Sequence, residues 1–253
     1  MFELTGRHIF IAGGSRGLGA ATARLAGKLG ARVSLTYNAN RNAAEKLVQE
    51  IRAAGGTAQD YAAQIEEDTS IAAAVDQAVK DLGPLAGMVV SSGIFEHRKI
   101  EELDTEFWER TMSINLRGTM LAVKAAARHM RQAGKGGSIV IYTSTAGQSG
   151  GGGGASAYSV SKAGQIVFAR CMAHELGPDG IRVNSLAPAW TETEMAAPHL
   201  ERLGRENVSK QFALRRIGQA DDVAKATCYL LSDASGFVTG TCHSVDGGMA
   251  MRG

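Results

Sequence analysis

Several features are scarce in this sequence of 253 residues. Only 4 residues are proline and 3 are cysteine, and charge is almost balanced, with 27 Lys+Arg against 25 Asp+Glu. That balance excludes the basic excess expected of a dedicated nucleic-acid binder, and a hydrophobic content of 44% excludes the composition of a disordered chain. No apolar run approaches the roughly 18 residues of a membrane span. We therefore expect a globular protein that binds neither nucleic acid nor membrane.

The three cysteines, Cys171, Cys228 and Cys242, are odd in number and lack the spacing of metal ligands. They suit a reducing compartment better than a disulfide framework, and we expect each to be a small core hydrophobe. The six histidines show no metal spacing either, so no metal site is expected. The segment Met1–Arg7 has no basic region followed by a long apolar stretch, so no signal peptide is expected. These features favour a cytoplasmic protein.

Glycine, by contrast, is abundant, with 32 residues, against an average share of about 7%. Such an excess indicates tight turns between strands and helices, or backbone that approaches a ligand closely. Short β-branched runs alternate with longer helical patterns along the whole chain. Strands are expected at Arg7–Gly13, Arg32–Tyr37, Thr57–Ala62, Gly87–Ser92, Ser138–Tyr142, Ile181–Ala187 and Thr241–Val245, and helices at Leu18–Leu29, Ala43–Ala54, Ser70–Leu82, Phe107–Ala133, Ala157–Leu176 and Asp221–Leu231.

This alternation implies right-handed crossovers and a mostly parallel sheet with helices on both faces. No linker rich in proline, serine or charge divides the chain. We therefore predict an α/β fold, a single domain over residues 1–253 built on a doubly wound, Rossmann-like parallel sheet. The segment 191–214 is long, polar and partly helical, which is typical of a substrate lid. The run Gly150–Gly154 lies between a strand and a helix that must pack together, which favours a mobile active-site loop over a linker.

A cluster of glycines joins the first strand to the first helix. Gly13, Gly17 and Gly19 follow the spacing Gly-x-x-x-Gly-x-Gly. At such a junction the backbone N–H groups and the helix dipole attract phosphate, and a Cβ would collide with a pyrophosphate or strain the turn. The cluster therefore predicts a dinucleotide site. The contacts expected from this loop are Gly13, Ser15, Arg16, Gly17, Leu18 and Gly19.

The end of the second strand indicates which dinucleotide binds. An NAD enzyme of this kind usually has an acidic residue there for the ribose hydroxyls, but this strand ends at Tyr37 and Asn38, and Arg41 follows. A guanidinium suits a 2′-phosphate, because its planar donors match the phosphate oxygens. Arg16 and Arg41 are the candidates, and a solvated surface position is the alternative for each. The pattern favours NADP(H) over NAD(H).

A serine, a tyrosine and a lysine form the candidate catalytic group. Ser144 follows the strand Ser138–Tyr142, and Tyr158 and Lys162 lie at i and i+4 on one face of the next helix. The ammonium is expected to lower the pKa of the phenol, which then exchanges a proton with a substrate oxygen that Ser144 holds. Alone, Tyr-x-x-x-Lys is more often a surface pair, but the upstream serine and glycine cluster favour the catalytic interpretation.

From about residue 4 to residue 249, these motifs resemble the short-chain dehydrogenase/reductase family, and within it the 3-oxoacyl-carrier-protein reductases. The resemblance implies that Tyr158 is the acid or base, that Ser144 positions the carbonyl, and that Lys162 tunes Tyr158 and binds ribose. Asn115 matches the fourth catalytic residue, whose carbonyl helps to hold a water in a proton relay with Lys162. The resemblance also implies a homotetramer.

Thr145 is an alternative to Ser144, because the separation between serine and tyrosine is one residue longer here than is common in the family. We prefer Ser144, because Ser144-Thr145-Ala146-Gly147 matches the family's Ser-x-x-Gly. The extra residue then falls in the run Gly150–Gly154.

The resemblance also identifies other cofactor contacts, with departures from the family pattern. Ala12 replaces a usual threonine, so a slightly looser turn is expected. Ser91 replaces the asparagine that normally ties neighbouring strands, Ala189 replaces a glycine, and the amide of Gln64 is expected at the adenine in place of an acid. The contacts expected outside the glycine cluster are Tyr37, Asn38, Arg41, Gln64, Ile65, Ser91, Ser92, Gly93, Tyr158, Lys162, Pro188, Thr191 and Thr193.

We therefore expect an NADP(H)-dependent oxidoreductase that transfers a hydride between nicotinamide and a small-molecule ketone or secondary alcohol. A 3-oxoacyl thioester on acyl carrier protein or CoA is a rival substrate class to a small ketone or sugar alcohol. Arg128, Arg131 and Lys135 lie where the family's reductases meet an acidic carrier, but His174 replaces a second arginine of that contact. Trp190 suits a substrate-facing role and a core role equally. The alternative function is a catalytically silent NADP-binding sensor or regulator on the same fold.

Overall fold

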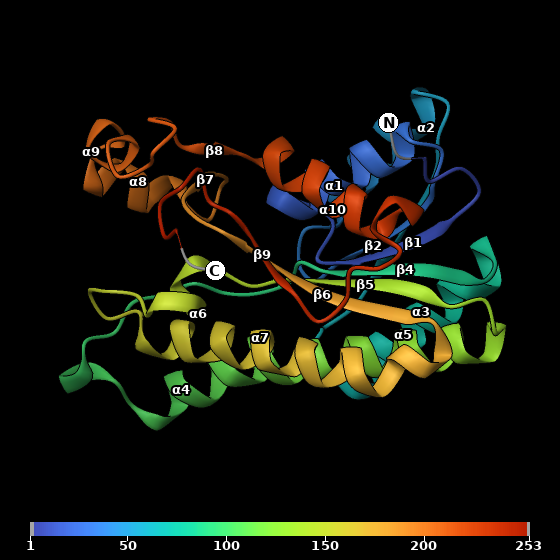
Figure 1. Ribbon diagram of the computed structural model, residues 1–253, viewed down its shortest axis with the longest axis horizontal. Helices are drawn as coiled ribbons and strands as arrows, with labels where there is room; N and C mark the ends of the chain where they lie inside the picture. The colour runs from blue at the N-terminus through green and yellow to red at the C-terminus, as the bar shows by residue number, and fades with distance from the viewer. Residues whose placement is uncertain (1–2, 252–253) are drawn as a thin grey trace.

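The computed structural model describes residues 3–251, so Met1, Phe2, Arg252 and Gly253 of the predicted domain lie outside the described part. A seven-stranded parallel sheet has the order β3-β2-β1-β4-β5-β6-β9 (Figure 1). The predicted doubly wound α/β sheet is confirmed. The strands are β1 (His8–Ala12), β2 (Arg32–Tyr37), β3 (Thr57–Ala62), β4 (Leu85–Val90), β5 (Gly137–Tyr142), β6 (Ile181–Pro188) and β9 (Cys242–Val245).

Helices cover both faces of this sheet (Figure 1). One layer contains α1 (Gly17–Lys28), α2 (Arg41–Ala53) and α10 (Ala220–Leu231), and the opposite layer contains α3 (Asp68–Leu82), α5 (Gly118–Ala133) and α7 (Ser156–Leu176). Because successive side chains of a strand point to opposite faces, Ile9 and Phe10 of β1 enter different cores. A strand between two cores must be apolar on both sides, which explains why β1 is buried along its whole length.

The long helix expected at 107–133 is interrupted. Helix α4 (Thr105–Met112) continues into a π-helical turn, Ser113–Arg117, and then into α5. Such turns widen a helix and often occur at functional sites. This one carries Asn115, which is fully buried and anchors the loop after β4: its Oδ1 accepts from the Ile94 N–H at 2.8 Å, and its Nδ2 donates to the Ile94 carbonyl at 3.0 Å.

Several short elements were given no bounds by the sequence. Helices α8 (Ala197–Leu203) and α9 (Arg205–Ser209) lie in the segment expected to be partly helical, whereas α6 (Thr145–Ser149) and the parallel pair β7 (Thr191–Glu192) with β8 (Gly218–Gln219) were not expected. Hydrophobic periodicity misses them because they are shorter than the window in which it is read. Helices α8 and α9 lie within the segment 191–214, at the end of the molecule where the loops after β5 and β6 also lie (Figure 1).

Within residues 3–251, no helix is both long enough and apolar enough to cross a membrane. Nor do these residues contain a group of three or more His, Cys, Asp or Glu side chains that would hold a metal ion. All three cysteines are free thiols. Cys228 is buried as expected, but the core role expected of Cys171 is wrong, because this residue lies on the exposed side of α7.

Candidate active site

The site lies where the order of strands changes direction. Strand β1 neighbours β2 on one side and β4 on the other, so the loops after β1 and β4 diverge and leave a crevice at the carboxyl edge of the sheet. A cavity of about 340 Å³ lies there. Most expected contacts line it: Gly13, Ser15, Arg16, Gly17, Leu18, Tyr37, Asn38, Ile65, Ser91, Ser92, Gly93, Tyr158, Lys162 and Thr193.

The glycine loop, residues 13–19, is built from close backbone contacts. A Cβ on Gly13 would lie 2.7 Å from the Ser92 nitrogen, and a Cβ on Gly19 would lie 2.3 Å from the Gly13 carbonyl oxygen. Gly19 therefore packs inside the turn instead of lining the cavity. Helix α1 begins after Arg16 with no capping side chain and no acidic residue in its first turn. Its first N–H groups and the positive end of its dipole are thus free for a phosphate.

A threonine of the second strand supports this loop. Thr36 Oγ1 accepts from the Gly13 N–H at 2.8 Å, and the Thr36 carbonyl accepts from the Gly14 N–H at 3.1 Å. The looser turn expected from Ala12 does not follow, because Thr36 supplies from a neighbouring strand the hydroxyl that position 12 lacks. The role of Thr36 was not predicted from the sequence. The one feature that indicated it is a hydroxyl side chain near the end of β2, the strand that pairs with β1.

Beyond β2, two expected contacts lie outside the cavity. The Arg41 guanidinium pairs with Glu45 at 2.7 Å on the exposed side of α2, because a carboxylate one turn along the helix is within reach. Gln64 is exposed, and its N–H donates to the Ser70 hydroxyl at 3.0 Å. Glu66, two residues further along, lines the cavity in its place. The structure thus places the carboxylate of Glu66 at this end of the cavity, and not the amide of Gln64.

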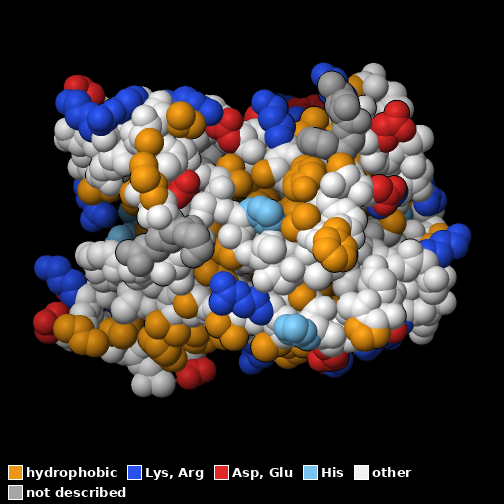
Figure 2. Space-filling model, in the orientation of Figure 1, with side chains coloured by type: hydrophobic (Ala, Val, Ile, Leu, Met, Phe, Trp, Pro, Cys, Tyr) orange, Lys and Arg blue, Asp and Glu red, His pale blue; other side chains and the backbone are white. Residues whose placement is uncertain are grey.

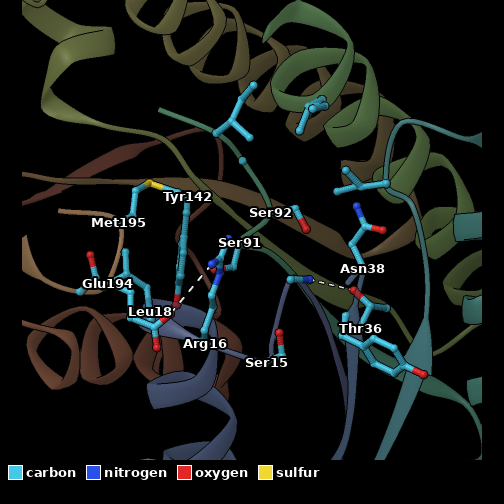
Figure 3. A pocket seen from close by; sticks show the side chains of 18 of the residues that line it. Ser15, Arg16, Leu18, Thr36, Asn38, Ser91, Ser92, Tyr142, Glu194 and Met195 are labelled. Carbon is cyan, nitrogen blue, oxygen red and sulfur yellow. Dashed lines mark hydrogen bonds and ion pairs between the residues drawn. The ribbon is translucent and has the colours of Figure 1, made fainter. Parts of the chain in front are cut away.

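After β6, Pro188 and Thr191 also lie outside the cavity. Both are buried, and the Thr191 hydroxyl donates to the Ala189 carbonyl at 3.0 Å. Thr193 does line the cavity, and Glu194 follows it with its Oε2 at 3.9 Å from Arg16 Nη1. In Figure 3, Glu194 and Met195 lie on one side of Arg16 and Ser15, and Thr36 and Asn38 lie on the other. The segment after β6 thus crosses in front of the glycine loop.

Ser144, Tyr158 and Lys162 meet beside the end of β5. A hydrogen bond joins the Ser144 and Tyr158 side chains, and Ser144 Oγ also caps α6 by accepting from the Ala146 N–H at 3.1 Å. Lys162 Nζ donates to the Tyr142 carbonyl at 2.7 Å and lies 5.7 Å from the centre of the Tyr158 ring. The two residues on α7 share a face, as their spacing predicts.

Burial dominates the electrostatics of this group. It raises the pKa of Tyr158 to about 12, against the opposing hydrogen bond from Ser144, and it lowers the pKa of Lys162 to about 7. The lowering of the Tyr158 pKa expected from the ammonium does not follow, because burial of the phenol has the larger and opposite effect. Tyr158 keeps its proton at neutral pH and can donate it.

The backbone carbonyl of Asn115 has two protein donors. Thr119 Oγ1 and Gln165 Nε2 both donate to it at 2.7 Å. A carbonyl oxygen offers two lone pairs. Both lone pairs of the Asn115 carbonyl therefore accept from protein groups, at the position where the resemblance implies a bound water. Gln165 is fully buried and was missed by sequence reasoning, although a glutamine amid the apolar positions of α7 was a visible signal.

A cluster of rings, which we call the ring wall, stands against Tyr158. Its members are Phe95, His97, Trp190 and His199, from the loop after β4, the loop after β6 and α8. The Phe95 ring centre lies 4.6 Å from that of Tyr158, 4.7 Å from that of His97 and 4.9 Å from that of His199. Trp190 completes the wall with its ring centre 6.0 Å from Phe95. Trp190 has both kinds of contact, because it meets Phe95 in this wall and also packs against the buried cluster of Ala196, Leu200, Val208, Phe212 and Ile217.

The run Gly150–Gly154 is hydrogen-bonded to the ring wall through His97. The Gly153 carbonyl lies 2.8 Å from Nδ1 of His97, and the Gly154 carbonyl accepts from the Arg98 N–H at 2.9 Å. A Cβ on Gly154 would lie 2.8 Å from the Arg98 carbonyl carbon, so this close approach requires glycine. The free mobility expected of the run does not follow from this arrangement.

A doubly wound parallel sheet, a glycine loop at the start of its first helix and a Ser-Tyr-Lys group at the end of β5 are typical of a nicotinamide-dependent oxidoreductase of hydroxyl and carbonyl groups. A family model described as Enoyl-(Acyl carrier protein) reductase matches residues 12–250. The L-rhamnose 1-dehydrogenase (NAD(P)(+)) of Azotobacter vinelandii is 34% identical, with 97% of each chain covered. The 3-oxoacyl-[acyl-carrier-protein] reductase of Synechocystis sp. is 33% identical, with 99% of this chain and 100% of the relative covered.

The solved structures agree with the sequence comparisons. A short-chain dehydrogenase/reductase from Serratia marcescens superimposes with a TM-score of 0.92 at 33% identity, covering 98% of this chain and 99% of that one. The chain belongs to the short-chain dehydrogenase/reductase family. It is accordingly an oxidoreductase that acts on CH–OH and C=O groups with a nicotinamide cofactor, NAD(P).

Proposed function

We propose that this protein is an NADP(H)-dependent oxidoreductase that interconverts a ketone and a secondary alcohol. The observation that carries the proposal is the Ser144–Tyr158–Lys162 group, which adjoins the cavity that the glycine loop also lines. Uncapped N–H groups at α1 and the glycine contacts fit the pyrophosphate, and Lys162 fits a ribose hydroxyl. When bound, the nicotinamide supplies or accepts the hydride.

The protein's own groups handle the oxygen of the substrate. The Ser144 hydroxyl is placed to donate a hydrogen bond to the carbonyl oxygen, which favours the charge that develops there. The Tyr158 phenol then gives that oxygen its proton, and it holds this proton at neutral pH because burial keeps its pKa at about 12. The Tyr142 carbonyl holds Lys162 beside the phenol. A protonated Tyr158 is the form that can donate a proton in the reduction of a ketone.

Turnover tests this proposal directly. Purified protein mixed with NADPH and a panel of ketones is expected to consume NADPH, which is followed by nicotinamide absorbance. Binding of NADPH with no turnover of any ketone or alcohol would contradict the proposal and favour the catalytically silent sensor.

The preference for NADP(H) rests on Arg16 and on the absence of a carboxylate at the end of β2, where Tyr37 and Asn38 line the cavity. Arg16 lines the cavity at the glycine loop, whereas Arg41 is paired with Glu45 outside it. We expect Arg16→Ala to lower the ratio of kcat/KM for NADPH to that for NADH by at least about tenfold, because a charge-assisted phosphate contact is lost. Arg41→Ala is the matched control and should change the ratio less than about twofold; equal effects would contradict the assignment.

A 3-oxoacyl thioester is the second candidate substrate class, supported by the Synechocystis relative. The basic cluster that would meet an acidic carrier protein does not favour it. Arg131 Nε lies 2.6 Å from a carboxylate oxygen of Asp179, and Arg128 is paired with Asp76, so both charges already have partners. We therefore place a free small-molecule ketone first.

We also propose a homotetramer. Helix α7 exposes Val160, Val167 and Cys171 along one side, and Figure 2 shows hydrophobic side chains gathered along the edge of the molecule over α4 and α7. An exposed apolar stripe on a helix is typical of a subunit contact. Light scattering should give four times the mass of the chain, and a monomer would contradict the proposal.

A further inference from the structure

The ring wall adjoins the catalytic tyrosine itself. Phe95 packs on the Tyr158 ring at 4.6 Å with the planes tilted by 57°, and His199 lies 4.9 Å from Phe95 at 52°. Because Phe95 contacts the Tyr158 ring, substituents of a substrate at Tyr158 that extend toward the loop after β4 meet these rings. Phe95, Trp190 and His199 are all only partly buried, so faces and edges of the rings remain for a ligand.

One ring nitrogen of His97 is fixed within the wall. Nδ1 of His97 lies 2.8 Å from the Gly153 carbonyl, which can only accept, so Nδ1 carries a proton. Nε2 of His97 is buried and has no hydrogen-bond partner among the described residues. Burial and the nearby His97 and Arg202 lower the pKa of His199.

Two guanidinium groups near the wall are already paired. In the loop after β4, Arg98 Nη1 lies 3.7 Å from Asp104, and its guanidinium lies over the Phe107 ring, 5.1 Å from the ring centre. In α4, Arg110 Nη1 lies 2.7 Å from Glu96. The loop therefore offers a substrate aromatic rings, and both of these guanidinium groups are held by the protein's own carboxylates.

We propose that the substrate is a ketone whose carbonyl carbon is attached to a planar aromatic ring, and that Phe95 and Trp190 select it. The inference rests on the proposed function and gives its substrate class. Tilted rings with centres about 5 to 6 Å apart accept a further flat ring edge-to-face or offset-stacked. A saturated ring of the same size is thicker and has no π-face, so it fits the same space less well.

Two ketones of nearly equal size make the test. Acetophenone and cyclohexyl methyl ketone differ only in whether the ring is aromatic or saturated. The readout is the ratio of kcat/KM for the aryl ketone to that for the saturated one, compared between variants so that intrinsic reactivity cancels. We expect Phe95→Leu and Trp190→Leu each to lower this ratio several-fold, and the double variant about tenfold or more, because each ring contact is worth a factor of roughly 2 to 10.

Phe237→Leu is the matched control, since Phe237 is fully exposed and lies outside the ring wall. It should leave the ratio unchanged. Thermal unfolding of each variant checks that the fold is kept, and Phe95 and Trp190 provide independent variants should one of them fail to fold.

The outcomes separate this inference from the proposed function. If both ketones are reduced and the ratio is the same in the parent, Phe95→Leu and Trp190→Leu enzymes, the substrate class is wrong while the proposed function stands. If neither ketone is reduced, nor any other, the proposed function fails. Calorimetric titration of the NADPH-loaded protein with the two ketones then decides: tighter binding of acetophenone that is lost in Phe95→Leu supports the ring wall, and equal binding overturns it.

Discussion

The glycine loop and the ring wall border the same site, but they are built in different ways. The loop is one short stretch, residues 13–19, in which backbone groups approach one another so closely that a Cβ on Gly19 would lie 2.3 Å from a carbonyl oxygen. The wall is made of whole side chains from segments about a hundred residues apart, such as Phe95 and His199. The cofactor site therefore tolerates almost no added atoms, whereas the wall can be changed one ring at a time.

Adding one methyl group to the loop should have the largest effect. Gly19→Ala places its Cβ against the Gly13 carbonyl, which cannot move aside without opening the turn. We expect NADPH affinity to fall at least about tenfold and the free energy of unfolding to fall by about 2 kcal/mol, the usual cost of overpacking. Gly177→Ala is the control, because a Cβ there meets nothing within 4 Å. Unchanged NADPH affinity in Gly19→Ala would show that the loop is less tightly built than described.

The strand that carries the loop depends on a buried histidine. His8 lies between the Gly83 carbonyl and the Ser34 hydroxyl, each at 2.7 Å, and burial lowers its pKa to about 4. The unfolded chain, with a His pKa near 6.5, binds a proton first as the pH falls. Neutral His8 therefore makes its full contribution to the free energy of unfolding above about pH 6.5. This contribution, at most about 3 kcal/mol, is lost as the pH falls toward 4.

His8→Gln removes this titration. Denaturant unfolding at pH 7 and at pH 4.5 should show the parent protein losing about 2 kcal/mol more than the variant over that interval. An equal loss in both proteins would mean that His8 does not anchor β1 in its neutral form.

A smaller change tests the support from the second strand. Thr36→Val keeps the β-branched shape but removes the hydroxyl that accepts from the Gly13 N–H at 2.8 Å. We expect the free energy of unfolding to fall by about 1 kcal/mol and NADPH affinity to fall several-fold, because a buried N–H loses its partner. Thr36→Ser retains the hydroxyl and should stay close to the parent. Equal NADPH affinity in the two variants would argue against this role.

The same contrast explains how far the sequence could predict the site. The alternation of strands and helices, the glycine loop and the Ser-Tyr-Lys spacing depend on local patterns, and these predictions agree with the structure. Thr36 and Glu66 were missed or placed wrongly because their role depends on which strand lies beside β1 and on how the chain turns after β3. The spacing of apolar residues along the chain gives no information about such contacts.

The ring wall could not be predicted from the sequence, for a related reason. Trp190 was noted as a residue with two possible roles, but Phe95 and His97 lie in an irregular loop whose position is fixed by Asn115 and by the glycine run. The pKa of Tyr158 was predicted in the wrong direction, because burial of the whole group outweighs the spacing of two side chains on a helix.

Proton transfer from the Tyr158 hydroxyl to the substrate oxygen is the central claim, and one pair of measurements tests it most directly. Tyr158→Phe keeps the ring against Phe95 and removes only the hydroxyl. Turnover of a ketone with NADPH should fall about a thousandfold, within the range for loss of a general acid, while NADPH affinity should stay within about twofold of the parent. A variant that retains more than about a tenth of the parent turnover would contradict the account.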